Sequence, residues 1–421
     1  MITLVEALNY RCLYDVRRPL GNLQILVGPN ASGKTTFLDV VAFLGRLVSD
    51  GPDAAVQERT QNFQDLVWNR SGTAFELAIE ALIPEKRRAN LKDGADTIRY
   101  EVGISSDTRS GEIEIVAEKV LLKKAHSPEP RVMELPFPGP ITKRKSILTK
   151  PRTHGARTVI TKAPGGNDGF YSEVHEEKGK GWVPVFKLGP RKSALGNLPE
   201  DESKFPAATW LKGLLTTGVQ PIVLNSLLLR KASPPSQVRA FKPDGSNLPW
   251  VIHSLQKKAE ERFKDWVLHL QTALPDIETI RTVEREDDRH RYMILRYRGG
   301  LEVPSWMASD GTLRLLALTV LPYLPSFDGV YMIEEPENGI HPLAVEPVFQ
   351  SLASVRSAQI LLATHSPVIL GIAEASQVLC FAKSKDPEGA VDIVPGSEHP
   401  GLREWKGQVG LGVLFASGVL G

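Results

Sequence analysis

The sequence is poor in cysteine and lacks long hydrophobic runs. Only two of its 421 residues are cysteines, Cys12 and Cys380, which excludes a disulfide framework and is typical of a reducing cytoplasm. The longest apolar stretch, residues 313–324, is interrupted by Arg314 and Pro322, so it is too short and too polar to span a membrane. The first residues do not follow the pattern of a signal peptide. We therefore expect a cytoplasmic protein that does not enter a membrane.

Neither sign of charge is in large excess. The chain has 51 Lys and Arg against 49 Asp and Glu, so its overall charge favours no particular partner. The distribution is uneven, however, because nine Lys or Arg face only two Glu between residues 121 and 160. Such a cluster can neutralise DNA phosphates, although it is also typical of a solvated loop. No aromatic residues alternate with the basic ones to stack on bases, which does not favour base recognition. DNA binding by this segment is therefore kept as an alternative and not as the preferred interpretation.

A glycine-rich motif stands near the start of the chain. Residues 28–36 fit the phosphate-binding pattern G-x-x-x-x-G-K-S/T, with an apolar run before them at 24–27 and a helix-length apolar pattern after them. Glycines let the backbone turn its N–H groups toward phosphate oxygens, and the helix directs its positive end at the same anion. The lysine can neutralise the outer phosphates, and the next hydroxyl can join the shell of a magnesium ion. An ordinary glycine turn before a core helix is the less favoured interpretation. The residues expected to contact nucleotide are Gly28, Pro29, Asn30, Ala31, Ser32, Gly33, Lys34, Thr35 and Thr36.

Two apolar runs far downstream end in polar residues. Residues 330–333 lead into Glu334 and Glu335, and residues 360–363 lead toward His365. The segment 342–353 between them predicts a crossover helix, so the runs would be parallel neighbours with Glu335 and His365 side by side at the ligand-binding edge. One carboxylate there can hold magnesium and its neighbour can polarise a water. A strand ending in a charged turn, with a structural histidine nearby, is the alternative.

A further helix start lies between these motifs. Ser309 and Gly311 open an apolar run, and small residues at a helix start can form an anion-binding end. Since one phosphate loop is already present, a second anion site indicates a nucleotide shared across a dimer. A core helix capped by Ser309 would explain the same residues.

These motifs, in this order, resemble the ABC-type, AAA-family ATPases of the SMC, RecF and OLD (overcoming-lysogenization-defect) group, and most of all a stand-alone OLD-like ATPase. The resemblance rests on the phosphate loop, Ser309-Asp-Gly-Thr-Leu-Arg314, Ile333-Glu-Glu-Pro-Glu-Asn-Gly-Ile-His-Pro342 and Ala363-Thr-His-Ser-Pro367. Asp244-Gly-Ser-Asn-Leu248 and the tail from Gly401 onward add to it. It covers residues 1–120 and about 241–421. It implies an α/β fold of the ABC-type P-loop NTPase class, with a mixed central sheet, an antiparallel β lobe and an inserted irregular subdomain.

The resemblance also implies roles for single residues, with ATP and Mg²⁺ as cofactors. Lys34 and Thr35 would bind phosphate and magnesium, Glu334 would be the acid at the metal, Glu335 the general base and His365 the switch histidine. Ser309 and Gly311 would contact the γ-phosphate bound by the opposite subunit of a homodimer or larger homo-oligomer. Two departures stand out. Many relatives carry Asp where this chain has Glu334, and the γ-phosphate-sensing glutamine has no clear match, with Gln61 and Gln64 as weak candidates.

Two functions from the same group are open. The first is a switch that dimerises on ATP and controls a separately encoded effector, such as a toprim-like nuclease, in bacterial defence. About 54 residues follow Pro367, too few for the toprim domain of OLD proteins, so we expect this chain not to be a nuclease itself. The alternative is a RecF- or SMC-like ATPase of DNA repair or maintenance that binds DNA through residues 121–160. A P-loop kinase or GTPase fits less well, because no Asn-Lys-x-Asp guanine-reading motif is present.

The pattern predicts three regions. Residues 1–120 form the first ATPase lobe, with two strands within 2–27 separated by a basic turn at Arg17 and Arg18, the loop and its helix, and three alternating runs typical of an antiparallel sheet. Residues 121–243 are rich in Pro and Gly and predict a basic, loop-rich insertion with one helical piece near 207–217. Residues 244–421 form the second lobe, with a long helix at 248–273 and strands at 277–283 and 292–297.

Overall fold

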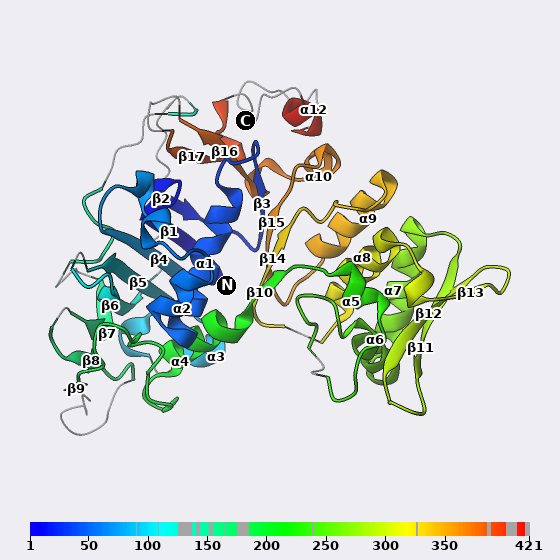
Figure 1. Cartoon of the computed structure of the whole chain (residues 1–421), viewed down its shortest axis with the longest axis horizontal. Coiled ribbons are helices and arrows are strands. Elements are labelled where there is room, and N and C mark those ends of the chain that lie inside the picture. The colour runs from blue at the N-terminus through cyan, green and yellow to red at the C-terminus, as the bar shows by residue number, and fades with distance from the viewer. Residues whose placement is uncertain are drawn as a thin grey trace.

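The computed structural model describes residues 1–89, 91–107, 109–124, 137–139, 144–150, 155–163, 165–174, 185–237, 240–325, 327–384, 389–400 and 411–416. Three sheets and the helices around them make up these residues (Figure 1). Most of the tail from Gly401 onward, which contributed to the family resemblance, lies outside them.

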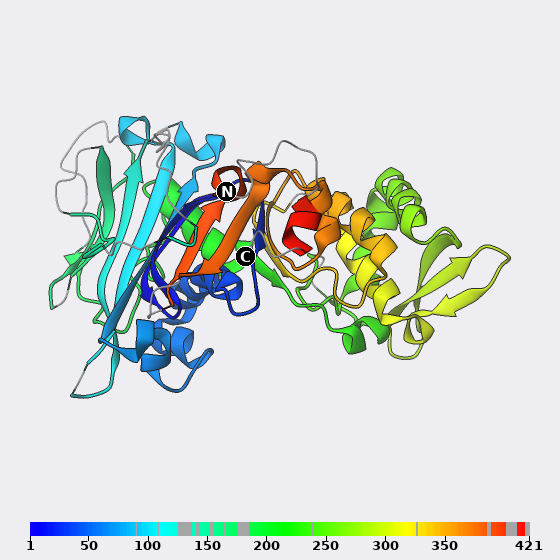
Figure 2. The same ribbon diagram turned by 90° about the horizontal axis from the view of Figure 1, so that it is seen from above.

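An eight-stranded antiparallel sheet forms one end of the molecule (Figure 2). Its order is β2-β1-β4-β5-β6-β7-β8-β9. The three predicted alternating runs are β4, β5 and β6, which confirms them. The predicted basic turn at Arg17 and Arg18 is wrong, because both residues lie inside β2 and pair with β1; the hairpin turns earlier, at Arg11, whose φ is 51°. The strands are β1 Ile2–Tyr10, β2 Leu13–Pro19, β4 Ala74–Leu82, β5 Thr97–Ser106, β6 Ile113–Lys123, β7 Ala156–Lys162, β8 Asp168–Phe170 and β9 Val185–Phe186.

A six-stranded, mostly parallel sheet occupies the middle of the molecule. Its order is β10-β14-β15-β3-β16-β17, and only β17 runs antiparallel to its neighbour. The crossover helix α9, Pro342–Ala353, joins β14 to its parallel neighbour β15, as the sequence predicts. The strands are β3 Leu23–Val27, β10 Val219–Ile222, β14 Val330–Glu334, β15 Gln359–Ala363, β16 Val378–Lys383 and β17 Val391–Pro395.

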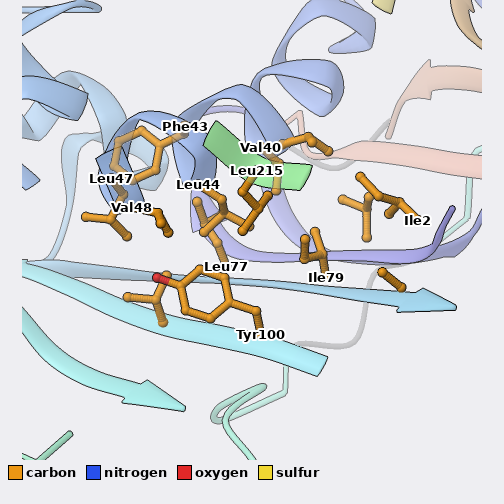
Figure 3. Packing of buried hydrophobic residues seen from close by; sticks show 14 of the residues in the cluster. Ile2, Val40, Phe43, Leu44, Leu47, Val48, Leu77, Ile79, Tyr100 and Leu215 are labelled. Carbon is orange, nitrogen blue, oxygen red and sulfur yellow. The ribbon is translucent and has the colours of Figure 1, made fainter. Parts of the chain in front are cut away.

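Helix α1, Lys34–Asp50, lies between these two sheets and carries the core of this half of the molecule. In Figure 3, Val40, Phe43 and Leu44 of α1 face Leu77 and Tyr100 of the antiparallel sheet. Alternate residues of the parallel strands point to opposite faces of the sheet, and each face packs into a core of its own. Leu26, Met332 and Leu361 belong to the α1 core, whereas Ile25, Ile333 and Leu362 belong to a second core on the other face.

The second core is built by helices and a small sheet at the far end of the molecule (Figure 2). It contains α6 Leu248–Lys258, α7 Glu260–Ala273, α8 Asp310–Thr319 and the sheet β11 Ile277–Glu284, β12 Arg291–Tyr297 and β13 Glu302–Pro304. The predicted helix 248–273 is in fact two helices, because Ala259 leaves the helical region at φ −148° and ψ 60°. Lysines end α6 and glutamates begin α7, as the helix dipoles favour.

Residues 121–243 contribute to both larger sheets instead of standing apart from them. Strands β7, β8 and β9 extend the antiparallel sheet, and β10 pairs with β14 at the edge of the parallel sheet. The predicted helical piece is α4, Pro206–Gly213, followed by a π-helical turn at Leu214–Gly218. Boundaries at residues 120 and 243 therefore cut through shared sheets: β6 continues past residue 120 to Lys123.

The remaining elements are short. They are α2 Pro52–Gln57, η1 Phe63–Leu66, η2 Trp68–Arg70, α3 Glu85–Arg88, η3 Lys92–Gly94, α5 Ser226–Arg230, η5 Ser305–Met307, η6 Leu321–Tyr323, α10 Pro367–Ile372, η7 Ala375–Gln377, η8 Gly396–Glu398 and α12 Leu411–Ala416. Among the described residues, no helix combines the length and apolar character needed to cross a bilayer.

Candidate functional site

The glycine-rich motif forms the turn between β3 and α1. Gly33 has φ 98°, a left-handed conformation that glycine adopts without strain, and α1 begins directly after it with no side chain capping its first turn. A Cβ on Gly28 would lie 2.3 Å from the carbonyl oxygen of Phe381, so the loop packs directly against β16. The uncapped N–H groups at the start of α1 are the donors that an anion can use.

Lys34 points back over this loop. Its Nζ donates hydrogen bonds to the carbonyl oxygens of Gly28 at 2.8 Å and Pro29 at 3.0 Å. Burial lowers the pKa of Lys34, although the nearby Glu335 and Glu334 oppose that shift. Even so, an amine held over a phosphate-binding turn is placed to neutralise an incoming anion.

The next residue of α1 contacts the acidic end of β14. The hydroxyl of Thr35 donates a hydrogen bond to Oε2 of Glu334, so the longer side chain in place of aspartate reaches the hydroxyl. A hydroxyl and a carboxylate oxygen are ligands that Mg²⁺ accepts, and Mg²⁺ usually completes its shell with water and substrate phosphates. The donors present therefore fit Mg²⁺ bound together with nucleotide.

Glu335 follows Glu334 in a strained conformation. Its φ is 48°, which is uncommon for a residue with a side chain and typical of functional turns. Its N–H donates to the carbonyl of Ala363 at 2.8 Å, and its Oε2 accepts a hydrogen bond from the Asn338 side chain. The turn directs the carboxylate into the same cavity as the phosphate loop instead of continuing the strand.

His365 follows the tip of the neighbouring strand β15, as the crossover argument predicts. It lines the same cavity as Lys34 and Glu335. Burial and the positive charge of Lys34 lower the pKa of His365, against the opposing effect of Glu335 and Glu337. A neutral imidazole at neutral pH can donate or accept a hydrogen bond.

The cavity has a volume of about 540 Å³, within the usual range of small-molecule sites. The phosphate loop from Asn30 to Thr36 lines it together with Glu334, Glu335 and His365. Sequence reasoning missed the other lining residues, because no motif marks them. They come from the β1–β2 hairpin, η1–η2, the end of β16 and the chain just before β17. They are Arg11, Cys12, Asp65, Val67, Trp68, Asn69, Arg70, Lys383 and Gly389. Neither Gln61 nor Gln64 lines this cavity in the described structure.

Ser309 and Gly311, which were predicted to contact the γ-phosphate of the opposite subunit, do not line this cavity. Ser309 caps α8, its hydroxyl accepting from the Thr312 N–H at 3.2 Å. Figure 1 shows α8 in the helical part of the molecule, on the far side of the parallel sheet from α1. A Cβ on Gly311 would lie 2.5 Å from the carbonyl oxygen of Gly339, so α8 packs against the loop that follows Glu335. One chain therefore does not bring Ser309 and Gly311 to its own phosphate loop.

The basic segment is partly engaged in internal ion pairs. Arg144 binds Asp15, with Nη2 2.6 Å from Oδ1, and Glu6, with Nη1 2.6 Å from Oε1. Lys123 pairs with Glu80. Lys145 is exposed, whereas Arg131, Lys143 and Arg152 lie outside the described residues.

The chain is similar to several known proteins. A family model described as "AAA domain, putative AbiEii toxin, Type IV TA system" matches residues 23–371. An OLD nuclease of Thermus scotoductus is 46% identical over 41 residues, which make up 10% of this chain and 8% of that protein. An Smc head bound to the C-winged helix domain of ScpA has a TM-score of 0.53 at 15% identity, covering 93% of this chain and 97% of that chain. An Smc head of Pyrococcus furiosus with an extended coiled coil has a TM-score of 0.48 at 12% identity, covering 93% and 95%.

The family model, the local match to the OLD nuclease and the Smc head with a TM-score of 0.53 confirm the resemblance to the SMC and OLD group and the expected fold, that of an ABC-type P-loop ATPase. The matching family model spans most of the chain. The protein therefore belongs to the family of AAA domains that this model describes.

Proposed function

We propose that this protein is a magnesium-dependent ATPase that closes as a dimer around ATP and acts as a switch. The observation that carries the proposal is the convergence of Lys34, the Thr35–Glu334 contact, Glu335 and His365 around one cavity at the carboxyl ends of β3, β14 and β15. In α/β sheets, ligands bind at this edge.

The chemistry follows from the positions of these side chains. The phosphate loop and Lys34 bind the phosphates, while Thr35 and Glu334 would hold Mg²⁺, which would neutralise charge between the phosphates. Glu335 accepts a proton from a water as that water attacks the γ-phosphorus, and the bond to the β-phosphate oxygen breaks to give ADP and phosphate. His365 faces the same space and orients the water or the γ-phosphate by hydrogen bonding.

The dimer is proposed because the site is incomplete in one chain. Ser309 and Gly311 mark the start of α8, whose N–H groups are suited to an anion, yet they do not line the cavity of their own chain. Next to them, Trp306 is 45% exposed and Met307 is 70% exposed. Large apolar side chains beside an anion-binding helix end are suited to burial against a second copy. A two-fold pairing would place each α8 start over the other chain's ATP.

The test uses a variant that binds ATP without hydrolysing it. Glu335→Gln should shift from a smaller to a larger species in light scattering when ATP and Mg²⁺ are added, and Ser309→Arg introduced into the same protein should abolish that shift. Ser203→Arg is the matched control, because Ser203 is an exposed serine outside the phosphate loop and the start of α8. If ATP and Mg²⁺ do not change the mass of Glu335→Gln, and adding Ser309→Arg does not change it either, the shared site would be contradicted.

We further propose that the switch controls a separately encoded effector, such as a toprim-like nuclease, in bacterial defence. The local likeness to an OLD nuclease supports it. Co-expression with the protein encoded next to it should give a complex whose stability depends on ATP in the wild type and not in Lys34→Ala.

The alternative of direct DNA binding through residues 121–160 has less support, because Arg144 and Lys123 are already paired with carboxylates. A salt-sensitive DNA complex that weakens when Lys143, Arg144 and Lys145 are neutralised would favour it instead.

A further inference from the structure

One carboxylate outside the sequence-derived site bridges the two strand tips. Oε1 of Glu337 accepts a hydrogen bond from the hydroxyl of Thr364 at 2.8 Å and another from the backbone N–H of His365 at 2.8 Å. Thr364 is fully buried, and its hydroxyl also accepts from the N–H of Ser366 at 2.9 Å. These bonds fix the stretch of backbone from which the His365 side chain projects.

The same glutamate belongs to the loop that carries Glu335. The N–H of Glu335 donates to Ala363 at 2.8 Å, and the N–H of Asn338 donates back to the carbonyl of Glu335 at 3.0 Å. The loop is therefore a tight, closed turn. Its position relative to β15 is set by one backbone bond at Glu335 and by the two bonds that Glu337 accepts.

The second carboxylate oxygen gives an independent clue. Oε2 of Glu337 is shielded from solvent and accepts no hydrogen bond from the part of the chain that the structure describes. A shielded carboxylate oxygen without a donor is costly, so a residue that served only the stability of the fold would more readily be neutral. The cost is easier to understand at a functional site, where such strain concentrates.

We propose that Glu337 is a positioning residue for ATP hydrolysis, which clamps the tips of β14 and β15 and thereby holds His365 in a fixed place relative to Glu335. The proposal rests on the proposed function, because this geometry matters for turnover only if the chain hydrolyses ATP. A displacement of about 1 Å between reacting groups can lower a rate by roughly 10²-fold. Glu337 itself does not line the cavity, so it acts through His365.

The kinetic test separates turnover from binding. Glu337→Ala should lower kcat by roughly 10²-fold, while ATP affinity stays within about threefold, because no contact of the phosphate loop changes. Glu337→Gln keeps an acceptor oxygen and should stay within about fivefold of the wild-type kcat. Thr364→Val and Thr364→Ser form a second pair, of which only the serine keeps the donor. Glu173→Gln is the matched control, since Glu173 accepts two backbone N–H bonds at the start of α4, away from the site.

Hydrogen exchange of the peptide spanning residues 359–370 reads the clamp without relying on turnover. Exchange should rise in Glu337→Ala and Thr364→Val and stay at the wild-type level in Glu337→Gln, Thr364→Ser and Glu173→Gln. Unchanged exchange in Glu337→Ala, equal losses of kcat in the alanine and glutamine variants, or a matching loss of ATP affinity would each overturn the positioning role. If the variants show the expected exchange pattern but the wild-type protein hydrolyses no ATP, the proposed function would be overturned instead. The catalytic consequence of the clamp would fail with it.

Discussion

A buried ionic network on the antiparallel sheet allows a quantitative prediction for Arg99→Met. Arg99, whose side chain is 8% exposed, contacts three buried carboxylates: Glu6, Glu80 at 3.2 Å and Glu101 at 2.8 Å. Its Nη2 also donates to the carbonyl oxygen of Ile147 at 2.9 Å, which attaches the segment 144–150 to the outer face of the sheet. The methionine fills much of the same space but removes the cation that these three carboxylates share. Glu6 keeps Arg144 and Glu80 keeps Lys123, whereas the carbonyl oxygen of Ile147 loses this hydrogen bond.

The expected cost is large because the charges left behind are buried. Removing one partner of a buried ion pair usually costs about 3–5 kcal/mol, so we expect Arg99→Met to lower the free energy of unfolding by that amount. Arg281→Met is the matched control, because Arg281 pairs with Glu302 at the surface, with both side chains more than a third exposed. It should cost at most about 1 kcal/mol. Guanidinium chloride unfolding, followed by circular dichroism, measures both.

The direction in which the stability deficit of Arg99→Met changes with pH follows from the pKa of Glu6. Burial alone would raise the pKa of Glu6, but Arg99, Arg144 and Arg17 together hold it below its ordinary value. In the wild type, this carboxylate therefore stabilises the fold above its unfolded-state pKa, and that contribution is lost as the pH falls through the folded-state value. In Arg99→Met, burial should dominate and raise the pKa of Glu6. The deficit relative to wild type should then shrink as the pH is lowered from neutral.

Two results would refute this reasoning. If Arg99→Met cost no more than Arg281→Met, the network would contribute no more than a surface pair. If the deficit grew on acidification, the carboxylates would not be left charged and buried by the substitution.

Three further predictions concern the nucleotide site and the helix behind it. Lys34→Ala should abolish ATP binding in isothermal titration calorimetry, whereas Lys264→Ala, at an exposed helical lysine, should leave it unchanged; normal binding by Lys34→Ala would contradict the phosphate-loop assignment. Thr35→Val should remove the effect of Mg²⁺ on ATP affinity while keeping magnesium-independent binding, and an intact magnesium effect would argue against the proposed ligand. Gly45→Ala should destabilise the fold by about 1–3 kcal/mol, since its Cβ would lie 2.4 Å from a backbone carbonyl oxygen. Gly213→Ala, with open space around the new Cβ, should be neutral or stabilising by up to about 1 kcal/mol; equal melting temperatures for the two glycine variants would disprove the packing argument.

Much of the nucleotide site could be predicted because short-range patterns define it. A strand, a glycine turn and a helix specify the phosphate loop, and the 342–353 crossover places Glu335 and His365 on neighbouring strand tips. The role proposed for Glu337 could not be predicted, because its partners Thr364 and His365 are set by a tertiary contact between two loops. Other residues that line the cavity, such as Trp68 and Arg70, were missed for the same reason.

The fold was predictable where periodicity was strong and less so elsewhere. Strands β4 to β6 alternate clearly, whereas β2 is hard to recognise because it contains Arg17 and Arg18. Their acidic partners are distant in sequence, since Arg17 pairs with Glu6 of β1 and Arg18 with Asp392 of β17. Strand β10 has only four residues and contains Pro221, so nothing local marks it as part of the parallel sheet. Its place depends on pairing with β14, more than a hundred residues away.

The close approach of Gly311 to the carbonyl oxygen of Gly339 couples the start of α8 to the loop that follows β14. No side chain fits at Gly311 unless the loop carrying Glu337 moves. In the proposed dimer, a variant at Gly311 would therefore disturb both the nucleotide site of its own chain and that of its partner. Its loss of activity would not identify a phosphate contact. Ser309 caps α8 and is not subject to that steric constraint. A substitution at Ser309 can therefore change the surface at the start of α8 while the loop carrying Glu335 and Glu337 stays in place.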